Sequence, residues 1–212
     1  MPERPERLAA VVLDYGNVLS RPQPREAVAR LEALSGLPGE VLWPANWGER
    51  VPYDRGVVDG TGYWAAIAAR AGRPRWPAAT VAELVAADVA SWSHVDPDMV
   101  AWAGALGRAG VATALLSNAP PELAAFIRER FDWVAGLDGR TFSCDLGAVK
   151  PEPAIYASCL AAIGVPAAEA LLVDDRKANV DGAVAYGMRG HVFTSRAALA
   201  GALRGSGLPL PA

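Results

Sequence analysis

The chain has 212 residues, of which 52 % are apolar and 20 % are charged, and its formal net charge is −3. This length accommodates one large α/β domain, or a core domain with a small insert. The acidic balance lacks the basic character typical of nucleic-acid-binding proteins, so we expect no nucleic-acid partner. Two cysteines form no disulfide framework, and the first apolar run is too short to span a bilayer. We therefore expect a cytoplasmic protein without a membrane partner.

The first structural signal is the apolar run Leu8 to Leu13, which leads directly into Asp14. A continuous apolar run followed by the turn residues Gly16 and Asn17 is typical of a buried strand in a parallel sheet. A carboxylate at the end of such a strand is costly unless a cation meets it. Ligands of open α/β sheets bind at the carboxyl ends of the strands. Asp14 is therefore a candidate reactive carboxylate.

Residues 20–95 show helical periodicity and no strand pattern. The spacing of apolar residues predicts helices over residues 24–34, 38–47, 60–70 and 77–92. Six of the seven tryptophans lie between Trp43 and Trp102, and we expect most of them to fill the interior of a small helical unit and some to line a site. We therefore predict an all-α insert after the first strand.

From Asp96 onward, short apolar runs alternate with helical patterns. The predicted strands cover residues 111–116, 133–137, 170–173 and 190–194, and the predicted helices cover residues 97–109, 120–130, 152–163 and 178–186, with Ser195 capping a last helix. This alternation is typical of βαβ units and a parallel sheet. The predicted fold is α/β, with a Rossmann-like parallel sheet core (residues 1–19 and 96–212) and an all-α helical domain (residues 20–95).

Polar side chains follow three of the predicted strands: Asp14 after the first, Ser117 and Asn118 after the second, and Asp174 and Asp175 after a later one. Parallel strands joined by right-handed crossovers end at the same edge of the sheet, so we expect these groups to meet. Three carboxylates close together suit a hard divalent cation such as Mg²⁺. Ser and Asn side chains and nearby backbone N–H groups can bind a phosphoryl group.

Lys150 completes this set from a loop that precedes a predicted helix. It is one of only two lysines, against 18 arginines, in the chain. Lysine is a compact point charge, so it can offset the charge of a carboxylate cluster and contact a phosphoryl oxygen. Asp14 would then be the nucleophile of a phosphoryl transfer.

Together these segments resemble the motifs of the haloacid dehalogenase (HAD) superfamily, in the branch with a helical cap inserted after the first motif. The matching segments are residues 14–19, 116–118, 150–151 and 173–179. The resemblance implies an Mg²⁺-dependent phosphatase that acts on a small phosphate monoester through an aspartyl-phosphate on Asp14, with Lys150 orienting that carboxylate. It implies phosphoryl binding by Ser117 and Asn118. The implied metal ligands are Asp14, the Gly16 carbonyl and Asp175, with Asp174 as a further ligand or behind them.

The chain departs from the usual pattern at Gly16, where most phosphatases of the superfamily carry a second Asp that acts as general acid and base. Such help is worth roughly 10²–10⁴-fold in rate. Glu49, Asp54 and His94 of the insert are candidates to replace the missing Asp. The default expectation for each of them is a solvated surface group.

Two further residues, Arg55 and Asn179, lie in segments that resemble the family. Arg55 lies in a segment that resembles a cap segment reaching toward the active site, and it is a candidate ligand for an anionic substrate. Asn179 stands at a position that is often Asp in the family.

Three other functions are alternatives to a phosphatase. A 2-haloacid dehalogenase also lacks the second Asp, but the acidic pair Asp174 and Asp175 would serve no purpose there. Phosphonate-cleaving relatives use a cap lysine, and residues 20–95 contain none. A binding or regulatory module with a weak active site is supported only by Gly16. The sequence leaves the physiological substrate open, and both a monomer and a homodimer remain possible.

Overall fold

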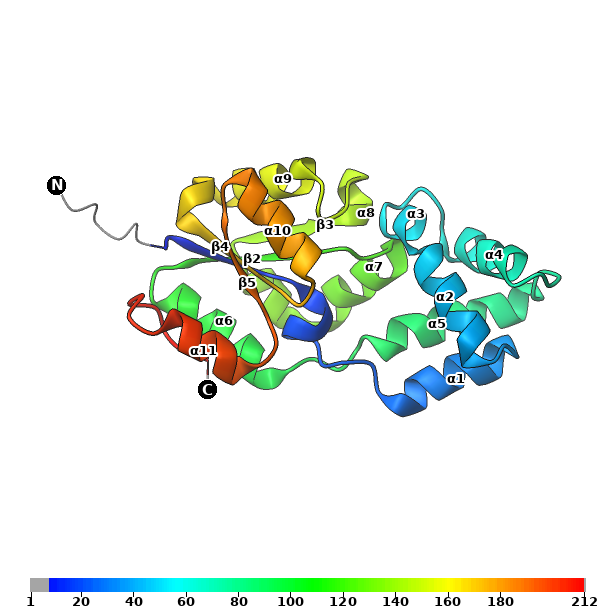
Figure 1. The fold of residues 1–212 in the computed structure, drawn as a ribbon. Coiled ribbons are helices and arrows are strands. Elements are labelled where there is room, and N and C mark those ends of the chain that lie inside the picture. The colour runs from blue at the N-terminus through cyan, green and yellow to red at the C-terminus, as the bar shows by residue number, and fades with distance from the viewer. Residues whose placement is uncertain (1–7, 212) are drawn as a thin grey trace.

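The computed structural model describes residues 8–211, so residues 1–7 and 212 of the predicted core domain lie outside the described residues. Its centre is a five-stranded parallel sheet with the order β3-β2-β1-β4-β5 (Figure 1). The strands are β1 (Ala10–Leu13), β2 (Ala112–Ser117), β3 (Gly139–Phe142), β4 (Ala170–Asp174) and β5 (Arg189–Val192). This sheet confirms the predicted α/β class and the Rossmann-like parallel core.

The central strand β1 is fully buried because helices cover both faces of the sheet. Its side chains alternate between the faces, with Val11 and Leu13 in one apolar cluster and Ala10 and Val12 in another. The first cluster contains side chains of α6 (Pro97–Arg108), α7 (Pro121–Arg130) and α11 (Arg196–Leu203). The second contains side chains of α9 (Pro153–Ile163) and α10 (Lys177–Tyr186).

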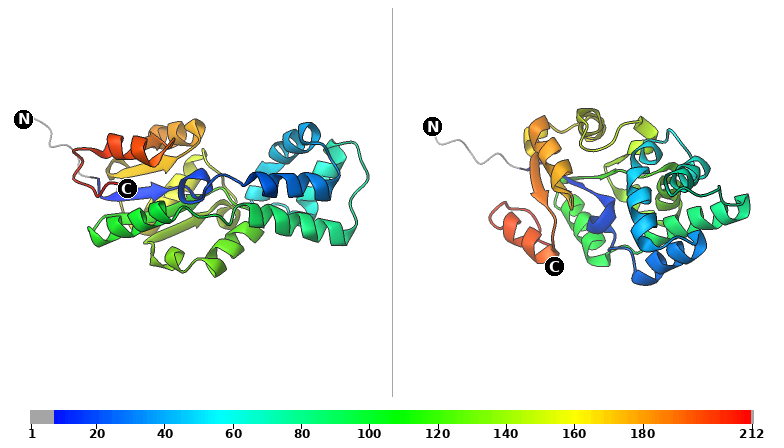
Figure 2. Two further views of the ribbon diagram at one scale, coloured as in Figure 1. Left: turned by 90° about the horizontal axis from the view of Figure 1, so that it is seen from below. Right: turned by 45° about the vertical axis from the view of Figure 1, so that its right-hand side comes forward.

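Five helices between β1 and α6 form a separate bundle. They are α1 (Arg25–Ser35), α2 (Gly39–Gly48), α3 (Arg50–Asp54), α4 (Gly60–Arg70) and α5 (Ala78–Ser91). The bundle has its own apolar interior, with Leu31, Leu42 and Leu84 among its buried side chains. Figures 1 and 2 show it beyond the carboxyl ends of the strands. We call it the α1–α5 bundle.

The two connections between the sheet and the bundle lie side by side. Ser20 pairs with Val95 in an antiparallel bridge, and the backbone N–H of Arg21 donates to the His94 carbonyl at 2.6 Å. The N–H of Asp96 donates to the Leu19 carbonyl at 2.8 Å. The chain therefore leaves and re-enters the sheet region at one place.

The tryptophans divide among the bundle interior, the sheet core and the site, so fewer of them fill the helical unit than we expect from the sequence. Trp64 and Trp76 pack edge to face in the bundle, with ring centroids 5.7 Å apart. Trp102 is buried against the sheet. Trp47 and Trp92 instead line the pocket described below.

The predicted strand over residues 133–137 is wrong. Asp132–Gly136 forms a 3₁₀ helix, and the strand at this edge is β3, Gly139–Phe142. The apolar run around Val134 has the composition of a strand, whereas Gly139 and Arg140 are weak strand formers. Gly139 is needed for packing, because a Cβ there would lie 2.6 Å from Cγ2 of Ile163 in α9. The other predicted elements are confirmed with ends shifted by one or two residues, while the short helices α3 and α8 (Ser143–Leu146) were not predicted.

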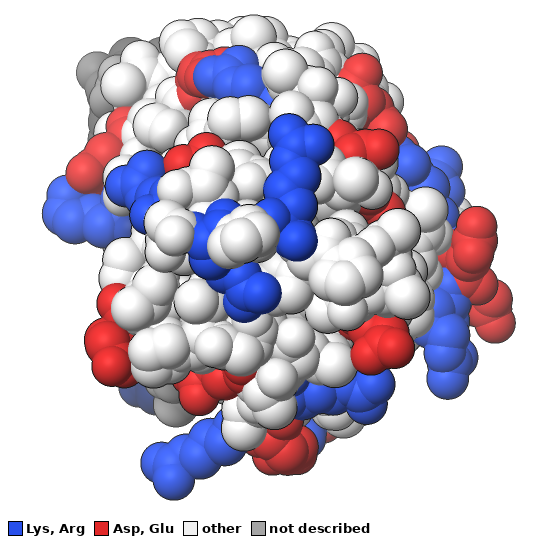
Figure 3. Space-filling view, turned by 90° about the vertical axis from the view of Figure 1, so that its right-hand side faces the viewer, with Lys and Arg blue, Asp and Glu red and all other residues white. Residues whose placement is uncertain are grey.

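The outer surface of the bundle carries charges of both signs. Figure 3 shows basic and acidic side chains on this face with uncharged surface between them. None of the helices in the described part of the chain combines the length and the apolar character that crossing a bilayer requires.

Candidate active site

The strand register places Asp14 at the centre of the carboxyl edge of the sheet. Leu13 of β1 pairs with Leu115 of β2 and with Val173 of β4, so the next residue, Asp14, is flanked by the ends of both neighbouring strands. Asp14 is only 7 % exposed, and its Oδ1 accepts a 2.7 Å hydrogen bond from the N–H of Tyr15. The sequence expectation that polar strand ends meet at one edge is therefore fulfilled for Asp14 and Asp174.

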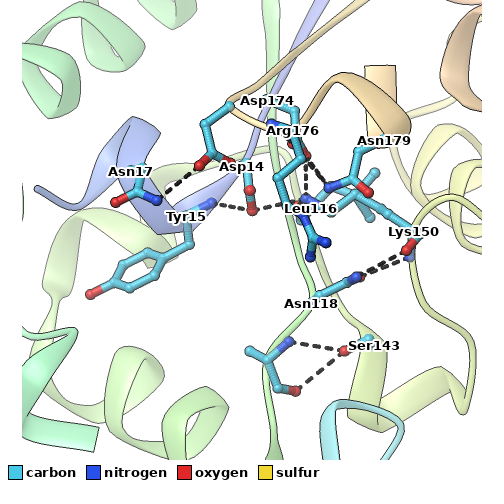
Figure 4. A network of polar contacts seen from close by, with 12 residues as sticks. Asp14, Tyr15, Asn17, Leu116, Asn118, Ser143, Lys150, Asp174, Arg176 and Asn179 are labelled. Carbon is cyan, nitrogen blue, oxygen red and sulfur yellow. Dashed lines mark hydrogen bonds and ion pairs between the residues drawn. The ribbon is translucent and has the colours of Figure 1, made fainter. Parts of the chain in front are cut away.

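Lys150 is the buried cation that this edge requires. Its Nζ lies 2.8 Å from Asp14 Oδ1 and 2.7 Å from Asp174 Oδ2, and it donates to the Leu116 carbonyl at 2.8 Å (Figure 4). Burial disfavours the charged amine, but the two carboxylates outweigh this effect and raise the pKa of Lys150 above its usual value. One ammonium group therefore orients both carboxylates.

Asn118 holds the loop that carries Lys150. The Lys150 N–H donates to Asn118 Oδ1 at 2.8 Å, and Asn118 Nδ2 donates back to the Lys150 carbonyl at 3.1 Å. The side-chain amide of Asn118 is thus engaged in positioning Lys150. Ser117, which is buried, lines the pocket beside Asn118.

Oxygen atoms of Asp14, Asp174 and Asp175 lie within 4.8 Å of one another. This distance suits carboxylates that share one hard cation. Desolvation by burial raises the pKa of Asp14 to about 7; Lys150 opposes the shift, and the charges of Asp174 and Asp175 add to it. The cluster can therefore hold a metal ion, which would relieve the repulsion among its carboxylates.

The two adjacent aspartates have different surroundings. Asp174 is fully buried, and besides Lys150 it accepts from the Arg176 N–H at 2.8 Å and from Asn179 Nδ2 at 2.9 and 3.0 Å. Asp175 is half-buried and lines the pocket, and its Oδ2 accepts from Asn17 Nδ2 at 2.8 Å. Asp175 is thus the more accessible carboxylate, whereas Asp174 lies behind it.

Asn179 stands at a position that is often Asp in the family, and it makes contacts that an ionised Asp could not make. Its amide nitrogen donates to both oxygens of Asp174, which an ionised carboxylate cannot do. The Tyr156 hydroxyl donates to the Asn179 carbonyl at 2.7 Å and holds this part of α10.

A pocket of about 100 Å³ opens above these groups, between the sheet edge and the α1–α5 bundle. The sheet side contributes the predicted residues Asp14, Gly16, Ser117, Asn118, Lys150 and Asp175, together with Asn17, Arg176 and Asn179. The bundle side contributes Trp47, Arg50 and Asp54, and Trp92 follows α5.

Arg55 does not belong to this pocket lining. Its Nη1 donates to the Gly147 carbonyl at 2.9 Å, and its Nη2 forms an ion pair with Glu152. The side chain therefore connects the bundle to the loop before α9, and the predicted contact with substrate finds no support in this geometry. The prediction for Arg55 rests on a resemblance of its own segment, whereas this ion pair joins residues far apart in the sequence.

Asn17, Arg50 and Arg176 are among the pocket residues that sequence reasoning missed. Asn17 has a positive φ of 57°, a conformation in which Asn is enriched, and its place in the first motif was the available signal. Arg50 and Arg176 were indistinguishable from the other arginines of an arginine-rich chain.

Gly16 lies beside the indole of Trp92 in the pocket lining. Its φ of −63° is open to any residue, and a Cβ there would lie 3.6 Å from Cζ3 of Trp92, in ordinary contact. Trp92 therefore occupies space next to the position where the family usually has its second Asp.

Comparison with known proteins agrees with this fold. The family described as haloacid dehalogenase-like hydrolase matches residues 8–187. No curated protein sequence matches the chain. Among solved structures, a HAD family enzyme of Bacteroides thetaiotaomicron in complex with magnesium and inorganic phosphate is 16 % identical, with a TM-score of 0.70, covering 88 % of this chain and 94 % of that one.

Two further structures share the fold. A predicted HAD-like family hydrolase of Porphyromonas gingivalis is 21 % identical, with a TM-score of 0.69 and coverage of 87 % and 90 %. An L-2-haloacid dehalogenase of Xanthobacter autotrophicus with covalently bound chloropropionic acid is 22 % identical, with a TM-score of 0.65 and coverage of 95 % and 84 %. Since the family match covers most of the sequence, the chain belongs to the haloacid dehalogenase-like hydrolases.

Proposed function

We propose that the protein hydrolyses a small phosphate monoester in an Mg²⁺-dependent reaction that passes through an aspartyl-phosphate on Asp14. The observation that carries the proposal is the composition of the site. One lysine pairs with two carboxylates of a cluster of three, and two members of this cluster line a pocket shared with Ser117 and Asn118.

The carboxylate of Asp14 is oriented for nucleophilic attack. Its Oδ1 is fixed by Lys150 Nζ and by the Tyr15 N–H, so the side chain has a defined direction at the floor of the pocket. A phosphorus atom above it would accept one carboxylate oxygen in line with the departing ester oxygen. Ser117, the backbone beside Asn118 and Arg176 surround the space where the phosphoryl oxygens would lie.

The residues present fit a magnesium ion. Mg²⁺ prefers oxygen ligands and is usually bound by one or two carboxylates together with substrate phosphate. Asp14 and Asp175 would hold it, with the Gly16 carbonyl as the further ligand that the family resemblance implies and Asp174 behind them. When bound, the ion would neutralise charge on the transferring phosphoryl group.

The alternative within the family is 2-haloacid dehalogenation. It is favoured by the absence of an Asp at Gly16 and by the fold shared with the haloacid dehalogenase. Against it, Asp175 lies half-buried in the pocket with Asn17, a neutral amide, as its hydrogen-bond partner. A carboxylate in that position could bind a cation, whereas it would repel the carboxylate of a 2-haloacid.

We further propose that residues 20–95 act as a cap domain over the site. The bundle has its own interior, is joined to the sheet at one place, and supplies Trp47, Arg50 and Asp54 to the pocket. A cap in this place would exclude water and select the substrate.

The test is phosphate release from a panel of sugar phosphates, nucleotides and an aryl phosphate, with Mg²⁺ and with chelator, for the wild type and Asp14→Asn. We expect release that requires Mg²⁺ and vanishes in the variant. Halide release from a 2-haloacid in the presence of chelator, without phosphate release from any substrate, would overturn the proposal in favour of the dehalogenase.

A further inference from the structure

The proposed hydrolysis needs a group that protonates the departing ester oxygen and later takes a proton from the attacking water. Gly16 has no side chain for this task. The proton donor must therefore come from another part of the pocket wall.

Among the described residues that line the pocket, the carboxylic acids are Asp14, Asp54 and Asp175. Asp14 and Asp175 belong to the metal cluster, and Asp54 does not. Asp54 is the last residue of α3, on the bundle side of the pocket, while Asp14 lies on the sheet side. In an in-line displacement the leaving oxygen lies away from the nucleophile, so a proton donor on the bundle side is well placed.

The other two candidates from the sequence lie elsewhere. Glu49 forms a 3.0 Å ion pair with Arg70. His94 is exposed and lines a separate hollow between α1 and α5. The expectation that all three are solvated surface groups is wrong for Asp54, which is only 7 % exposed.

Asp54 is held from both sides of the pocket. Its Oδ1 accepts from Arg50 Nε at 2.8 Å, and Arg50 Nη1 donates to Asp88 of α5 at 3.1 Å. Its backbone carbonyl accepts from Ser143 Oγ at 2.5 Å, and this hydroxyl in turn accepts from the Ala119 N–H at 2.9 Å. The residue is therefore fixed to the bundle by its side chain and to the sheet domain, next to Asn118, by its backbone.

The charges around Asp54 leave it able to change protonation state. Burial raises its pKa to about 6, although Arg50 and Arg176 oppose the shift; Asp88 adds to it. Tyr63 of α4 and Tyr53 of α3 are close to Arg50 and remain neutral, because burial raises their pKa values further above their usual values. An acid whose pKa lies near the working pH can both donate and accept a proton.

Provided that the proposed function holds, we propose that Asp54 is the general acid and base of this hydrolase, in place of a residue at position 16. In the first step an Asp14 oxygen bonds to phosphorus, the ester P–O bond breaks, and the Asp54 proton passes to the departing oxygen, which leaves as the alcohol. In the second step Asp54 takes a proton from water, whose oxygen bonds to phosphorus as the P–O bond to Asp14 breaks. Inorganic phosphate leaves, and Asp14 and protonated Asp54 are restored.

The test compares leaving groups. Asp54→Asn keeps an oxygen for Arg50 but cannot donate the proton, and Glu49→Gln is the matched control outside the pocket. We expect kcat/KM for an alkyl phosphate, a poor leaving group, to fall by roughly 10²-fold or more in Asp54→Asn. The kcat/KM for 4-nitrophenyl phosphate, whose leaving group needs no proton, should change only severalfold, because this parameter covers the steps up to departure of the leaving group and not the later attack of water. Glu49→Gln should match the wild type on both substrates.

Equal losses on the two substrates, or no loss, would overturn the role of Asp54. Failure of the wild type to hydrolyse 4-nitrophenyl phosphate with Mg²⁺ would instead overturn the proposed function. If Asp54→Asn does not fold, the wild-type pH profile carries the test. Because a general acid must be protonated, kcat/KM for the alkyl ester should fall relative to the nitrophenyl ester above about pH 6; parallel profiles would overturn the proposal.

Discussion

The ammonium group of Lys150 lies 2.8 Å from a carboxylate oxygen of Asp14, although the two residues are far apart in the sequence. The same Nζ contacts Asp174 at 2.7 Å and the Leu116 carbonyl at 2.8 Å, in a position where the lysine side chain has no solvent exposure. Three acceptors around one compact cation leave no space for a larger head group.

Lys150→Arg should therefore lose most activity although it keeps the charge. The planar guanidinium cannot replace one nitrogen that meets three acceptors. We expect kcat to fall by roughly 10²–10³-fold, the scale seen when one preorganised charge-stabilising donor is lost. The other lysine offers a matched control: Lys177→Arg, on the surface beside Asp181, should leave kcat unchanged. Wild-type turnover in Lys150→Arg would contradict the role given to this residue.

Asp175 and Asp174 should respond differently to neutralisation. Asp175→Asn should weaken Mg²⁺ binding measured by calorimetry and leave the melting temperature nearly unchanged, because the residue faces the pocket. Asp174→Asn should instead lower the free energy of unfolding by about 3 kcal/mol, because it removes a buried partner of Lys150. The reverse pattern would show that Asp174 is the direct ligand.

Asn17 should act on the metal site through Asp175. Loss of a side chain that orients a metal ligand typically costs about 10–100-fold in metal affinity or activity. Asn17→Gly removes the 2.8 Å hydrogen bond while permitting the positive φ of 57°, and Asn17→Ala adds backbone strain. We expect both variants to show the loss of Mg²⁺ affinity, with a larger drop in melting temperature for Asn17→Ala. Unchanged affinity in Asn17→Gly would mean that the bond does not orient Asp175.

Arg176 and Arg55 should differ in phosphate binding. Arg176 lines the pocket, whereas Arg55 contacts Gly147 and Glu152. Arg176→Ala should raise the inhibition constant for inorganic phosphate as a product inhibitor, while Arg55→Ala should leave it unchanged. Because its ion pair is partly exposed, Arg55→Ala should cost at most about 1 kcal/mol of stability. A raised inhibition constant in Arg55→Ala would restore the original prediction of a substrate contact.

Much of the fold and the centre of the site followed from local patterns. The apolar run before Asp14, the alternation of strands and helices after Asp96, and polar residues at strand ends predict a parallel sheet with a polar edge. Those signals are strong because burial on both faces of the sheet leaves strands as apolar runs. The edge strand β3 was missed because an edge strand needs fewer apolar residues. In addition, close packing against Ile163 requires a glycine at position 139, and glycine is a weak strand former.

The remaining site residues depend on contacts between distant segments. Nothing near Asp54 in the sequence indicates that Arg50, Asp88 and Ser143 would bury it at the pocket wall. Asp174 and Asp175 are neighbours with the same chemistry, and only the placement of Asn17 and Asn179 separates their roles. Such differences arise from tertiary packing, which residue patterns along one chain do not encode.

The most direct test of the account is to look for the phosphoryl group on Asp14 itself. The enzyme would be mixed with Mg²⁺ and a phosphate monoester that it hydrolyses, and the reaction would be quenched in acid during turnover. The protein would then be digested and analysed by mass spectrometry. The account predicts a phosphorylated peptide containing Asp14, absent without Mg²⁺ and absent in Asp14→Asn. Continued turnover of substrate with no phosphate on that peptide in burst-phase quenches, or an alkyl ester at Asp14 after incubation with a 2-haloacid, would contradict it.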